Sequence, residues 1–426
     1  ENDIVMLVAT NDYGFICSYF ATHLIGGVVV NLAPDADEEY KNLLLEKTAH
    51  CFIIENCDGY IAKLASYPEF VYSELNDDRL SEIVFTSGTT GEAKGITLTH
   101  REVLAATKHI IAQVNNNQAD VELLLMPLSH SFGMARMRTT LFAGGQLVLG
   151  YSLLRLKTVF KAFELYGITG IGLVPSAWQY ILNMSKEKIS GYAGQLNYIE
   201  FGSAYLPNDD KFLLKQWFPK THIVLHYGLT EVSRAQFIFL HTDPIDAVGY
   251  LPRGCEVLIM GDGDELIGDD SVGEILLKAD WMTSGYYQNS ELTSDNFVDG
   301  YIKTGDQGYV QGECLFLTGR IKEIINVGGK KVNPYRIEKL MNGFDFVNES
   351  ACSSGFDKVS GEVVNAFIVL DPESTVSETD AIDQIKIAIA ASFPSYMRPV
   401  KYHFLACLPK TSTGKIKRLT LSIGKD

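Results

Sequence analysis

The sequence predicts an α/β protein with a large N-terminal part of layered, mostly parallel sheets and a small α+β C-terminal domain. From residue 4 to about residue 228, short apolar runs alternate with amphipathic helix patterns, which is typical of parallel α/β layers. Residues 248–318 combine short strands with Gly- and Asp-rich turns, which indicates an antiparallel, barrel-like module. Beyond Arg320, about 100 residues with two helix patterns are enough for a separate small domain.

The individual elements follow from local patterns. The apolar runs that predict buried strands are residues 4–9, 28–32, 82–87, 123–128, 168–175, 198–203 and 222–228. Thr99 and Glu102 form a capping-box pattern, so a helix is expected from there to about Val114. Further helices are expected at residues 156–167, 334–341 and 380–393.

Composition limits the function classes. The chain has 426 residues, 46% hydrophobic and 21% charged, and a formal net charge of −16. These values fit a globular protein of two or three domains, and they argue against non-specific binding to nucleic acid or to an anionic membrane surface. Its 7 cysteines are scattered without a CxxC pair. Structural zinc is therefore not expected, and we expect the protein in a reducing compartment, the cytoplasm. No apolar run has the length of a transmembrane helix.

The stretch FTSGTTGEAKG, residues 85–95, gathers hydroxyls, glycines and one lysine directly after a buried strand. Backbone amides and an ammonium on such a loop favour a bound phosphate. With a helix pattern soon after it, the loop is expected at a helix entrance, although it does not fit the Walker A pattern. The candidate phosphate-binding residues are Thr86, Ser87, Gly88, Thr89, Thr90, Gly91 and Lys94.

This loop resembles the signature loop of the adenylate-forming enzymes, which include acyl- and aryl-CoA synthetases, peptide-synthetase adenylation domains and firefly luciferase. The resemblance is nearest to the acyl and aryl acid ligases. Other family motifs follow in order: MPLSHSFGM (126–134), GSAYLP (202–207), YGLTE (227–231), GEI…SGYY (273–287), YIKTGDQGYV (301–310), GRIKEIINVGGKKVNP (319–334) and PKTSTGKIKR (409–418). Family members usually carry more residues ahead of positions 4–32, so part of the first subdomain is expected to be missing.

The YGLTE motif places a ring, a hydroxyl and a carboxylate close together. Tyr227 is suited to stack on a purine, Thr230 to donate to a phosphate, and Glu231 to bind Mg²⁺, which takes oxygen ligands. A glutamate after a strand is more often part of a solvated turn, and it is the resemblance that favours the magnesium site. The small residues Gly202, Ser203 and Ala204 and the motif's Gly228 complete the expected AMP-binding surface.

The resemblance assigns further roles. It implies that Asp306 and Arg320 face the ribose, where an acidic residue can accept both hydroxyls. By the same resemblance, His130, Phe132 and Gly228 line the pocket of the acid, and His130 gates it. A lone histidine in a polar loop is more often structural.

The C-terminal part is implied to move during the reaction. Residues 1–321 would form the adenylation core and residues 322–426 a mobile domain, with its hinge at Lys322. Lys415 would bridge the carboxylate and the α-phosphate, where its charge offsets the repulsion between two anions. Gly328 and Gly329 would line the tunnel for the thiol.

The resemblance therefore implies an ATP- and Mg²⁺-dependent acid:thiol ligase that forms an acyl- or aryl-adenylate and passes the acyl group to CoA or to a carrier-protein phosphopantetheine. Its expected partners are a small carboxylic acid and either acceptor, with no nucleic acid and no membrane insertion. A free-standing amino-acid adenylation enzyme and an inactive nucleotide-binding homologue remain alternatives. Residues 129–133 lack the aspartate that usually pairs with an α-amine, which favours an acid without one.

Three arginines have no role that the sequence settles. Arg136 and Arg138 are two residues apart on a predicted helix, so they do not share a face. One of them could reach the pocket or the phosphates, and a surface position is at least as common. The role of Arg234 stays open.

Overall fold

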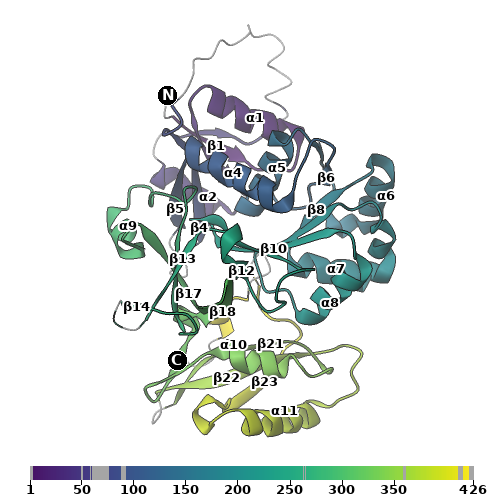
Figure 1. Ribbon diagram of the computed structural model, residues 1–426, viewed down its shortest axis with the longest axis vertical. Coiled ribbons are helices and arrows are strands. Elements are labelled where there is room, and N and C mark those ends of the chain that lie inside the picture. The colour runs from purple at the N-terminus through teal and green to yellow at the C-terminus, as the bar shows by residue number, and fades with distance from the viewer. Residues whose placement is uncertain are drawn as a thin grey trace. The chain divides into compact units, whose positions relative to one another are not determined.

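The computed structural model describes residues 3–48, 51–57, 59, 76–87, 93–261, 263, 265–357, 361–410 and 416–421 (Figure 1). The chain divides into two compact units: Glu1–Val257 with Leu277–Ile302, and Leu258–Leu276 with Lys303–Asp426. The domain boundary at residues 321–322 and the hinge at Lys322 remain predictions. Within the described ranges, no helix is both long and apolar enough to cross a membrane.

The first sheet of unit 1 has the strand order β3-β1-β2-β4-β5. Its first four strands are parallel, and β5 runs antiparallel to β4. The connecting helices α1 (Tyr13–Leu24) and α2 (Glu38–Lys47) each begin with an aspartate cap. The strands are β1 (Ile4–Val8), β2 (Val28–Leu32), β3 (Phe52–Ile54), β4 (Leu80–Ser87) and β5 (Ala93–Thr99).

The expected position of the phosphate loop at a helix entrance is wrong. The loop joins β4 to β5 in an antiparallel hairpin in which Thr86 pairs with Lys94. Helix α4 (His100–Val114) begins only after β5, and its predicted capping box between Thr99 and Glu102 is present. Strand β5 therefore lies between residues 88–92, which are outside the described residues, and the first turn of α4.

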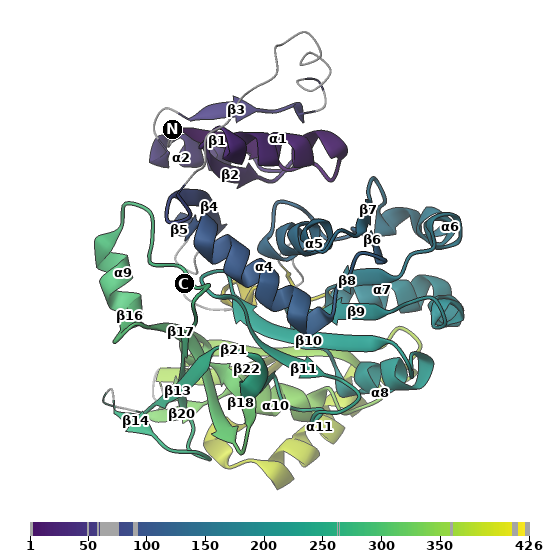
Figure 2. The same cartoon turned by 45° about the horizontal axis from the view of Figure 1, so that its top comes forward.

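The second sheet has the order β11-β10-β9-β8-β6-β7, and only β11 is antiparallel to its neighbour. Helices α6, α7 and α8 gather along one side of it (Figures 1 and 2) and share a large apolar core with β8, β9 and β10. The elements are β6 (Val121–Leu123), α5 (Ser131–Phe142), β7 (Gln146–Val148), α6 (Leu156–Tyr166), β8 (Gly170–Leu173), α7 (Pro175–Ser185), β9 (Tyr198–Phe201), α8 (Asn208–Trp217), β10 (His222–Leu229) and β11 (Ser233–Phe239).

Helix α5 belongs to the cores of both sheets. Met134 and Met137 pack with the strands of the first sheet, while Ala135 packs with β9, β10 and β11 of the second. Because successive residues of a helix point in different directions, one helix can serve both layers. The layered, mostly parallel prediction for this part is confirmed.

Unit 2 contains antiparallel pairing and a small α+β module. Strand β17 (Tyr301–Gln311) pairs with β18 (Cys314–Arg320), and β13 (Glu256–Met260) with β14 (Leu266–Ile267). The last sheet has the order β20-β19-β22-β21, with β23 beside β22, and α10 (Pro334–Met341) and α11 (Glu378–Ser392) share its apolar core. Its strands are β19 (Ile325–Val327), β20 (Lys330–Val332), β21 (Val347–Asp357), β22 (Gly361–Leu370) and β23 (Lys401–Phe404).

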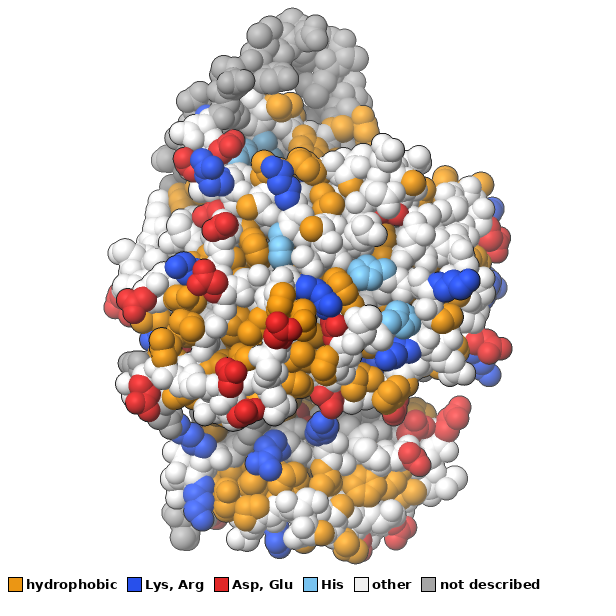
Figure 3. All heavy atoms as spheres, in the orientation of Figure 1, with side chains coloured by type: hydrophobic (Ala, Val, Ile, Leu, Met, Phe, Trp, Pro, Cys, Tyr) orange, Lys and Arg blue, Asp and Glu red, His pale blue; other side chains and the backbone are white. Residues whose placement is uncertain are grey.

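The remaining elements are short. They are β12 (Gly249–Tyr250), β15 (Gly273–Lys278), α9 (Ser290–Asn296), β16 (Phe297–Val298) and several 3-10 turns, of which Ile321–Glu323 and Arg418–Leu421 matter below. On the face shown in Figure 3, basic and acidic side chains are interspersed.

Candidate functional site

Three of the sequence motifs follow the carboxyl ends of strands in the second sheet. MPLSHSFGM comes after β6, GSAYLP directly after β9, and YGLTE covers the end of β10. These three strands are parallel and belong to one sheet, so their carboxyl ends lie along one edge. Ligands of open α/β sheets bind at that edge. The order of the strands in the sheet could not be predicted from the sequence. In the structure, this order places the three predicted motifs along the same edge.

The loop after β9 is held in an unusual conformation. A Cβ on Gly202 would lie 2.0 Å from Nε2 of His226, so no larger residue fits there. The next residue, Ser203, has a φ of +72°, which costs free energy for a residue that is not glycine. Such backbone strain gathers at ligand sites, and here it falls on the residues predicted to face the adenine.

Strand β10 and its neighbour β11 approach each other closely at Gly228. A Cβ at this position would lie 2.0 Å from the carbonyl oxygen of Ser233, and the pairing register shifts between Tyr227 and Gly228. The bulge lets the chain turn after Leu229 and present Thr230 and Glu231 beyond the end of the strand.

The carboxylate of Glu231 is held from one side. Its Oε1 accepts a hydrogen bond from the Tyr286 hydroxyl at 2.9 Å, and its backbone carbonyl accepts from the amide of Thr283 at 2.8 Å. Burial raises the pKa of Tyr286, and the nearby Glu231 raises it further, so the hydroxyl stays a donor. None of the residues that the structure describes donates a hydrogen bond to Oε2 of Glu231. This carboxylate oxygen is a ligand of the type that Mg²⁺ takes.

The donors fit a magnesium ion that is shared with phosphate. In the described ranges, no three His, Cys, Asp or Glu residues come together as a metal cluster. Mg²⁺ commonly uses one or two carboxylates and fills its other positions with water and phosphate oxygens. A site in which Glu231 is the one carboxylate ligand is consistent with this mode of Mg²⁺ binding. It is not consistent with a site whose ligands all come from the protein.

His130 and Thr230 line one small cavity of about 30 Å³ inside unit 1. His130 is the N-cap residue of α5 but makes no capping bond with its side chain. Burial lowers its pKa, an effect that Asp35 partly opposes, so the ring is neutral at pH 7. The cavity wall also contains Ser129, Ser131, Glu82, Glu102, Arg138, Ser233 and Trp281. Two motifs a hundred residues apart in the chain thus meet at one space.

One wall of this cavity is a buried ion pair. Arg138 Nη1 donates to Glu82 Oε1 at 2.5 Å, and the Tyr19 hydroxyl donates to the same carboxylate. Burial alone would raise the pKa of Glu82, but Arg138 and His23 outweigh it and hold that pKa below its usual value. Arg138 therefore ties α5 to β4 of the first sheet.

His23 beside this pair should make stability depend on pH. Burial lowers the pKa of His23 to about 4, more than Glu82 raises it, while His100 and Arg138 lower it further. The unfolded chain binds the proton near pH 6.5, so stability falls as the pH drops from about 6.5 to about 4, by roughly 3 kcal/mol in full. In His23→Phe we expect a smaller loss over this window, measured by urea unfolding at pH 7 and pH 4.5. Equal losses in both proteins would contradict this assignment.

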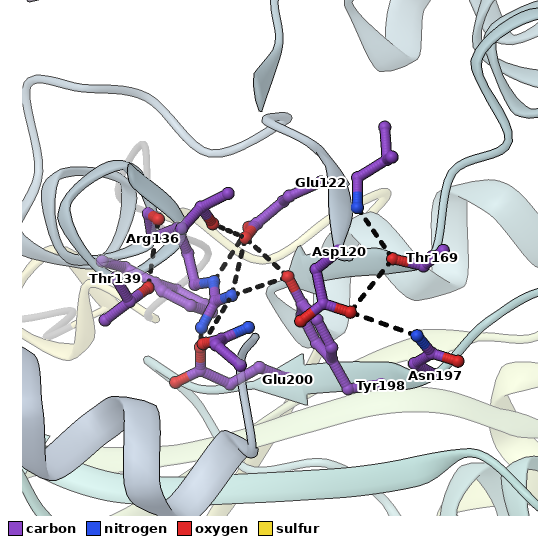
Figure 4. A network of polar contacts seen from close by, with 12 residues as sticks. Asp120, Glu122, Arg136, Thr139, Thr169, Asn197, Tyr198 and Glu200 are labelled. Carbon is purple, nitrogen blue, oxygen red and sulfur yellow. Dashed lines mark hydrogen bonds and ion pairs between the residues drawn. The ribbon is translucent and has the colours of Figure 1, made fainter. Parts of the chain in front are cut away.

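Arg136 lies on the opposite side of α5, in a fully buried network (Figure 4). Its Nε donates to Glu122 at 2.8 Å, its Nη1 to Glu200 at 3.0 Å, and its Nη2 to the Tyr198 hydroxyl at 2.8 Å. The prediction that the two arginines do not share a face is confirmed. The surface interpretation is wrong for both, because each finds a buried carboxylate on a different sheet.

Arg234 joins the same network from β11. Its Nε donates to Glu200 Oε1 at 2.6 Å, and its guanidinium carbon lies 4.9 Å from the centre of the Phe132 ring. His226 Nδ1 is 2.7 Å from the same carboxylate oxygen, but it is not aligned for a hydrogen bond. Burial would raise the pKa of Glu200, yet Arg234, Arg136 and His226 together hold it well below the usual range.

Sequence reasoning missed the carboxylates Glu82, Glu122 and Glu200 and assigned no role to Arg234. Charged residues inside apolar strand patterns are the signal that could have found them, since such residues are rarely buried without a partner. The partners themselves lie 14 to 64 residues away along the chain, so no local pattern pairs them.

The remaining predicted residues lie in unit 2 or outside the described ranges. Asp306 and Arg320 face each other across the β17–β18 pairing, with Arg320 Nε 3.0 Å from Asp306 Oδ1. Lys322 lies in the 3-10 turn Ile321–Glu323, and Gly328 and Gly329 form the turn between β19 and β20 with positive φ. The predicted residues Gly88, Thr89, Thr90, Gly91 and Lys415 lie outside the described residues.

The surroundings of the last motif are described on both sides of residues 411–415. Lys410 and Ile416 form an antiparallel bridge. Arg418 donates to Glu323 at 2.7 Å and also pairs with Glu338 on α10. The motif is therefore anchored within unit 2, next to the turn that contains Lys322.

Family models decide the classification. The model described as AMP-binding enzyme matches residues 1–287, and the model described as AMP-binding enzyme C-terminal domain matches residues 336–415. The chain belongs to the AMP-binding enzyme family. This confirms the resemblance to the adenylate-forming enzymes on which the sequence predictions rest.

Curated relatives of this family member are CoA ligases. An oxalate–CoA ligase of Saccharomyces cerevisiae is 30% identical over 347 residues, which is 80% of this chain and 62% of that protein. A 4-coumarate–CoA ligase-like protein of Arabidopsis thaliana is 27% identical over 421 residues, which is 96% of this chain and 73% of that protein. The chain thus spans about two thirds of the length of these relatives.

Solved structures share the fold. ATP-bound MatB from Rhodopseudomonas palustris has a TM-score of 0.88 at 22% identity, covering 99% of this chain and 88% of that one. An o-succinylbenzoate CoA synthetase from Bacillus subtilis, in complex with its acyl-adenylate intermediate, has a TM-score of 0.84 at 20% identity, covering 100% and 89%. The predicted fold class is confirmed by these likenesses.

Proposed function

We propose that this AMP-binding enzyme is an ATP-dependent acid:thiol ligase that works through an acyl-adenylate. In the first step the carboxylate of the acid attacks the α-phosphate of ATP, and pyrophosphate leaves. In the second a thiol attacks the acyl carbonyl, and AMP leaves. The observation that carries the proposal is the cavity in which His130 and Thr230, from two separate strand ends, lie together.

Each group of site residues is assigned to one part of the substrates. Tyr227 and the strained loop Gly202–Ala204 are assigned to the adenine, and Thr86 to Lys94 with Thr230 to the phosphates. Asp306 and Arg320 are assigned to the ribose. Glu231 would hold Mg²⁺, which neutralises phosphate charge when bound. His130, neutral at pH 7, is suited to border a carboxylate without forming an ion pair that would have to be broken.

The thiol and the acid are separate questions. The curated relatives are named as CoA ligases, which supports CoA over a carrier protein, with Gly328 and Gly329 assigned to its tunnel. Their names differ in the acid, from oxalate to 4-coumarate. A cytoplasmic location remains part of the proposal.

The test is acid-dependent exchange of labelled pyrophosphate into ATP, followed by thioester formation with CoA or with a holo-carrier protein. Exchange with any acid supports an active ligase, and exchange restricted to α-amino acids favours the amino-acid alternative. No exchange with short, medium, aryl or amino acids would indicate the inactive homologue.

Glu231→Gln should weaken adenylation mainly at limiting Mg²⁺. The amide keeps the shape and can still accept from Tyr286, but it loses the charge that attracts the cation. We expect the Mg²⁺ concentration for half-maximal exchange to rise about tenfold or more, with an unchanged unfolding midpoint. Glu164→Gln is the matched control, because Glu164 also accepts from a tyrosine hydroxyl, that of Tyr192 at 3.1 Å. The same Mg²⁺ dependence in both variants would rule out the metal assignment.

A further inference from the structure

A short segment of unit 1, residues 285–287, extends the sheet that contains the β4–β5 hairpin. Strand β5 is the last strand of that sheet, and this segment pairs with its outer edge. The amide of Tyr287 donates to the carbonyl of Gly95 at 2.7 Å, and the amide of Thr97 donates to the carbonyl of Gly285 at 3.2 Å. These bonds attach the segment to the second strand of the hairpin whose loop is predicted to bind phosphate.

The residue in the middle of this segment is Tyr286. Its backbone lies opposite Ile96 of β5 in an antiparallel bridge, and the residue is only 8% exposed. Its hydroxyl donates to Oε1 of Glu231 at 2.9 Å. One residue therefore contacts the hairpin through its backbone and the proposed metal ligand through its side chain.

The chain just before this segment holds the backbone around Glu231. The amide of Thr283 donates to the Glu231 carbonyl at 2.8 Å, and the Thr283 hydroxyl donates to the carbonyl of Thr97 at 2.5 Å. The indole nitrogen of Trp281 donates to the carbonyl of Val232 at 2.9 Å. The turn between β10 and β11 is therefore attached to β5 by residues that are distant from both in the sequence.

The hydroxyl of Tyr286 is not needed for packing. Phenylalanine would bury the same ring, and a polar group that is buried without a hydrogen bond is costly. The carboxylate that accepts from this hydroxyl is the one assigned to Mg²⁺. Side chains that hydrogen-bond a metal ligand fix its orientation, and their loss typically lowers metal affinity by about 10- to 100-fold.

We propose that Tyr286 is a positioning residue for Glu231. It fixes one carboxylate oxygen of Glu231 relative to the β4–β5 hairpin, and the other oxygen is left for a Mg²⁺ ion that the phosphates of ATP also contact. This rests on the proposed ligase function and adds the residue that aligns its metal ligand with its phosphate-binding hairpin. A ligand that is oriented before binding loses less conformational freedom when the ion arrives, so it binds the ion more tightly.

The test is Tyr286→Phe, which removes the hydroxyl and keeps the ring. Calorimetry measures ATP binding in EDTA and over a series of Mg²⁺ concentrations, without turnover. The Mg²⁺ concentration that gives half of its effect on ATP binding should rise about tenfold, while the affinity for ATP in EDTA stays within about twofold. In pyrophosphate exchange the half-maximal Mg²⁺ concentration should rise by the same factor, and the rate at saturating Mg²⁺ should stay within about threefold.

Two further variants separate positioning from folding. Tyr192→Phe is the matched control, because the Tyr192 hydroxyl also donates to a carboxylate, that of Glu164 at 3.1 Å, and its Mg²⁺ dependence should be unchanged. The second is Tyr286→Phe combined with Glu231→Gln. Without the charge of Glu231 there is no metal ligand to orient, so Tyr286→Phe should add less than about twofold to the Mg²⁺ requirement of Glu231→Gln.

The outcomes separate this inference from the function on which it rests. An unchanged Mg²⁺ requirement in Tyr286→Phe, or its full effect again in the double variant, would overturn the role of Tyr286. A loss of ATP affinity in EDTA as large as the change in Mg²⁺ requirement would mean a structural role and would also overturn it.

If no acid supports exchange, the ligase proposal fails, and ATP binding then tests Tyr286 alone. A Mg²⁺ requirement that rises in Tyr286→Phe but not in Tyr192→Phe supports the inference. Equal requirements in these two variants, or ATP binding that is undetectable or independent of Mg²⁺ in the unmodified protein, overturn it.

Discussion

Lys415→Ala is expected to slow formation of the acyl-adenylate by roughly three orders of magnitude. An ammonium about 4 Å from a developing negative charge contributes about 4 kcal/mol at an effective dielectric constant of about 20. We propose that Lys415 makes this interaction mainly in the transition state, where a carboxylate approaches an anionic phosphate. Its loss therefore appears in the rate of adenylation more than in the binding of ATP.

The same variant should spare the second step. If the C-terminal domain rotates between the half-reactions, Lys415 has left the site when the thiol attacks. Thioester formation from a supplied acyl-adenylate should then stay within about threefold of the unmodified protein. Lys417→Ala is the control, because Lys417 lies in the same motif and is exposed.

Lys322→Pro should have the opposite effect. Proline fixes φ and so restricts rotation at the proposed hinge, which should slow thioester formation more than adenylation. Both half-reactions are measured in both variants by pyrophosphate exchange and by single-turnover thioester formation. Equal impairment of the two steps in Lys415→Ala would contradict alternation between two domain positions.

Local patterns predicted those parts of the fold that local interactions determine. The capping box at Thr99 and Glu102 and the helix Pro334–Met341 appear as expected, because caps and amphipathic periods act within a few residues. The strands of the second sheet are recognisable for a similar reason, since buried parallel strands are continuous apolar runs. Motif order then supplied the family and with it the candidate residues.

The β4–β5 hairpin could not be predicted in this way. Residues 93–99 contain Lys94 and Gly95 and only a short alternation of apolar and polar residues at 96–99. Contacts far along the chain complete their environment. The Thr97 hydroxyl donates to the carbonyl of Gly285 at 2.8 Å, and the Thr283 hydroxyl donates to the carbonyl of Thr97 at 2.5 Å. Tertiary partners of this kind decide strand formation where the sequence alone is ambiguous.

Arg136→Met is expected to destabilise the folded protein by about 3 to 5 kcal/mol. Methionine fills much of the same space, so the main cost is electrostatic. Without Arg136, the donors to Glu122 that remain among the described residues are the hydroxyls of Thr140 at 2.5 Å and Tyr198 at 2.8 Å. The Glu122 carboxylate is fully buried. Glu200 keeps Arg234 as its partner, so most of the loss should come from Glu122. Urea unfolding at pH 7 measures the difference.

A second substitution distinguishes charge from packing. Arg136→Met combined with Glu122→Gln removes the unpaired charge while Tyr198 and Thr140 can still donate to the amide oxygen, so it should recover about 1 to 3 kcal/mol of the loss. Arg101→Met is the control for removing an ion pair in water, because the side chains of Arg101 and Asp78 are 59% and 65% exposed, and it should cost about 0.5 kcal/mol or less. If the double variant is as unstable as Arg136→Met, the loss of stability comes from the changed shape of the side chain at position 136 and not from the unpaired charge of Glu122. Recovery would mean that the buried charge of Arg136 holds α5, the helix that begins next to His130, against the second sheet. The desolvation cost of that charge is then offset by the carboxylates with which it pairs.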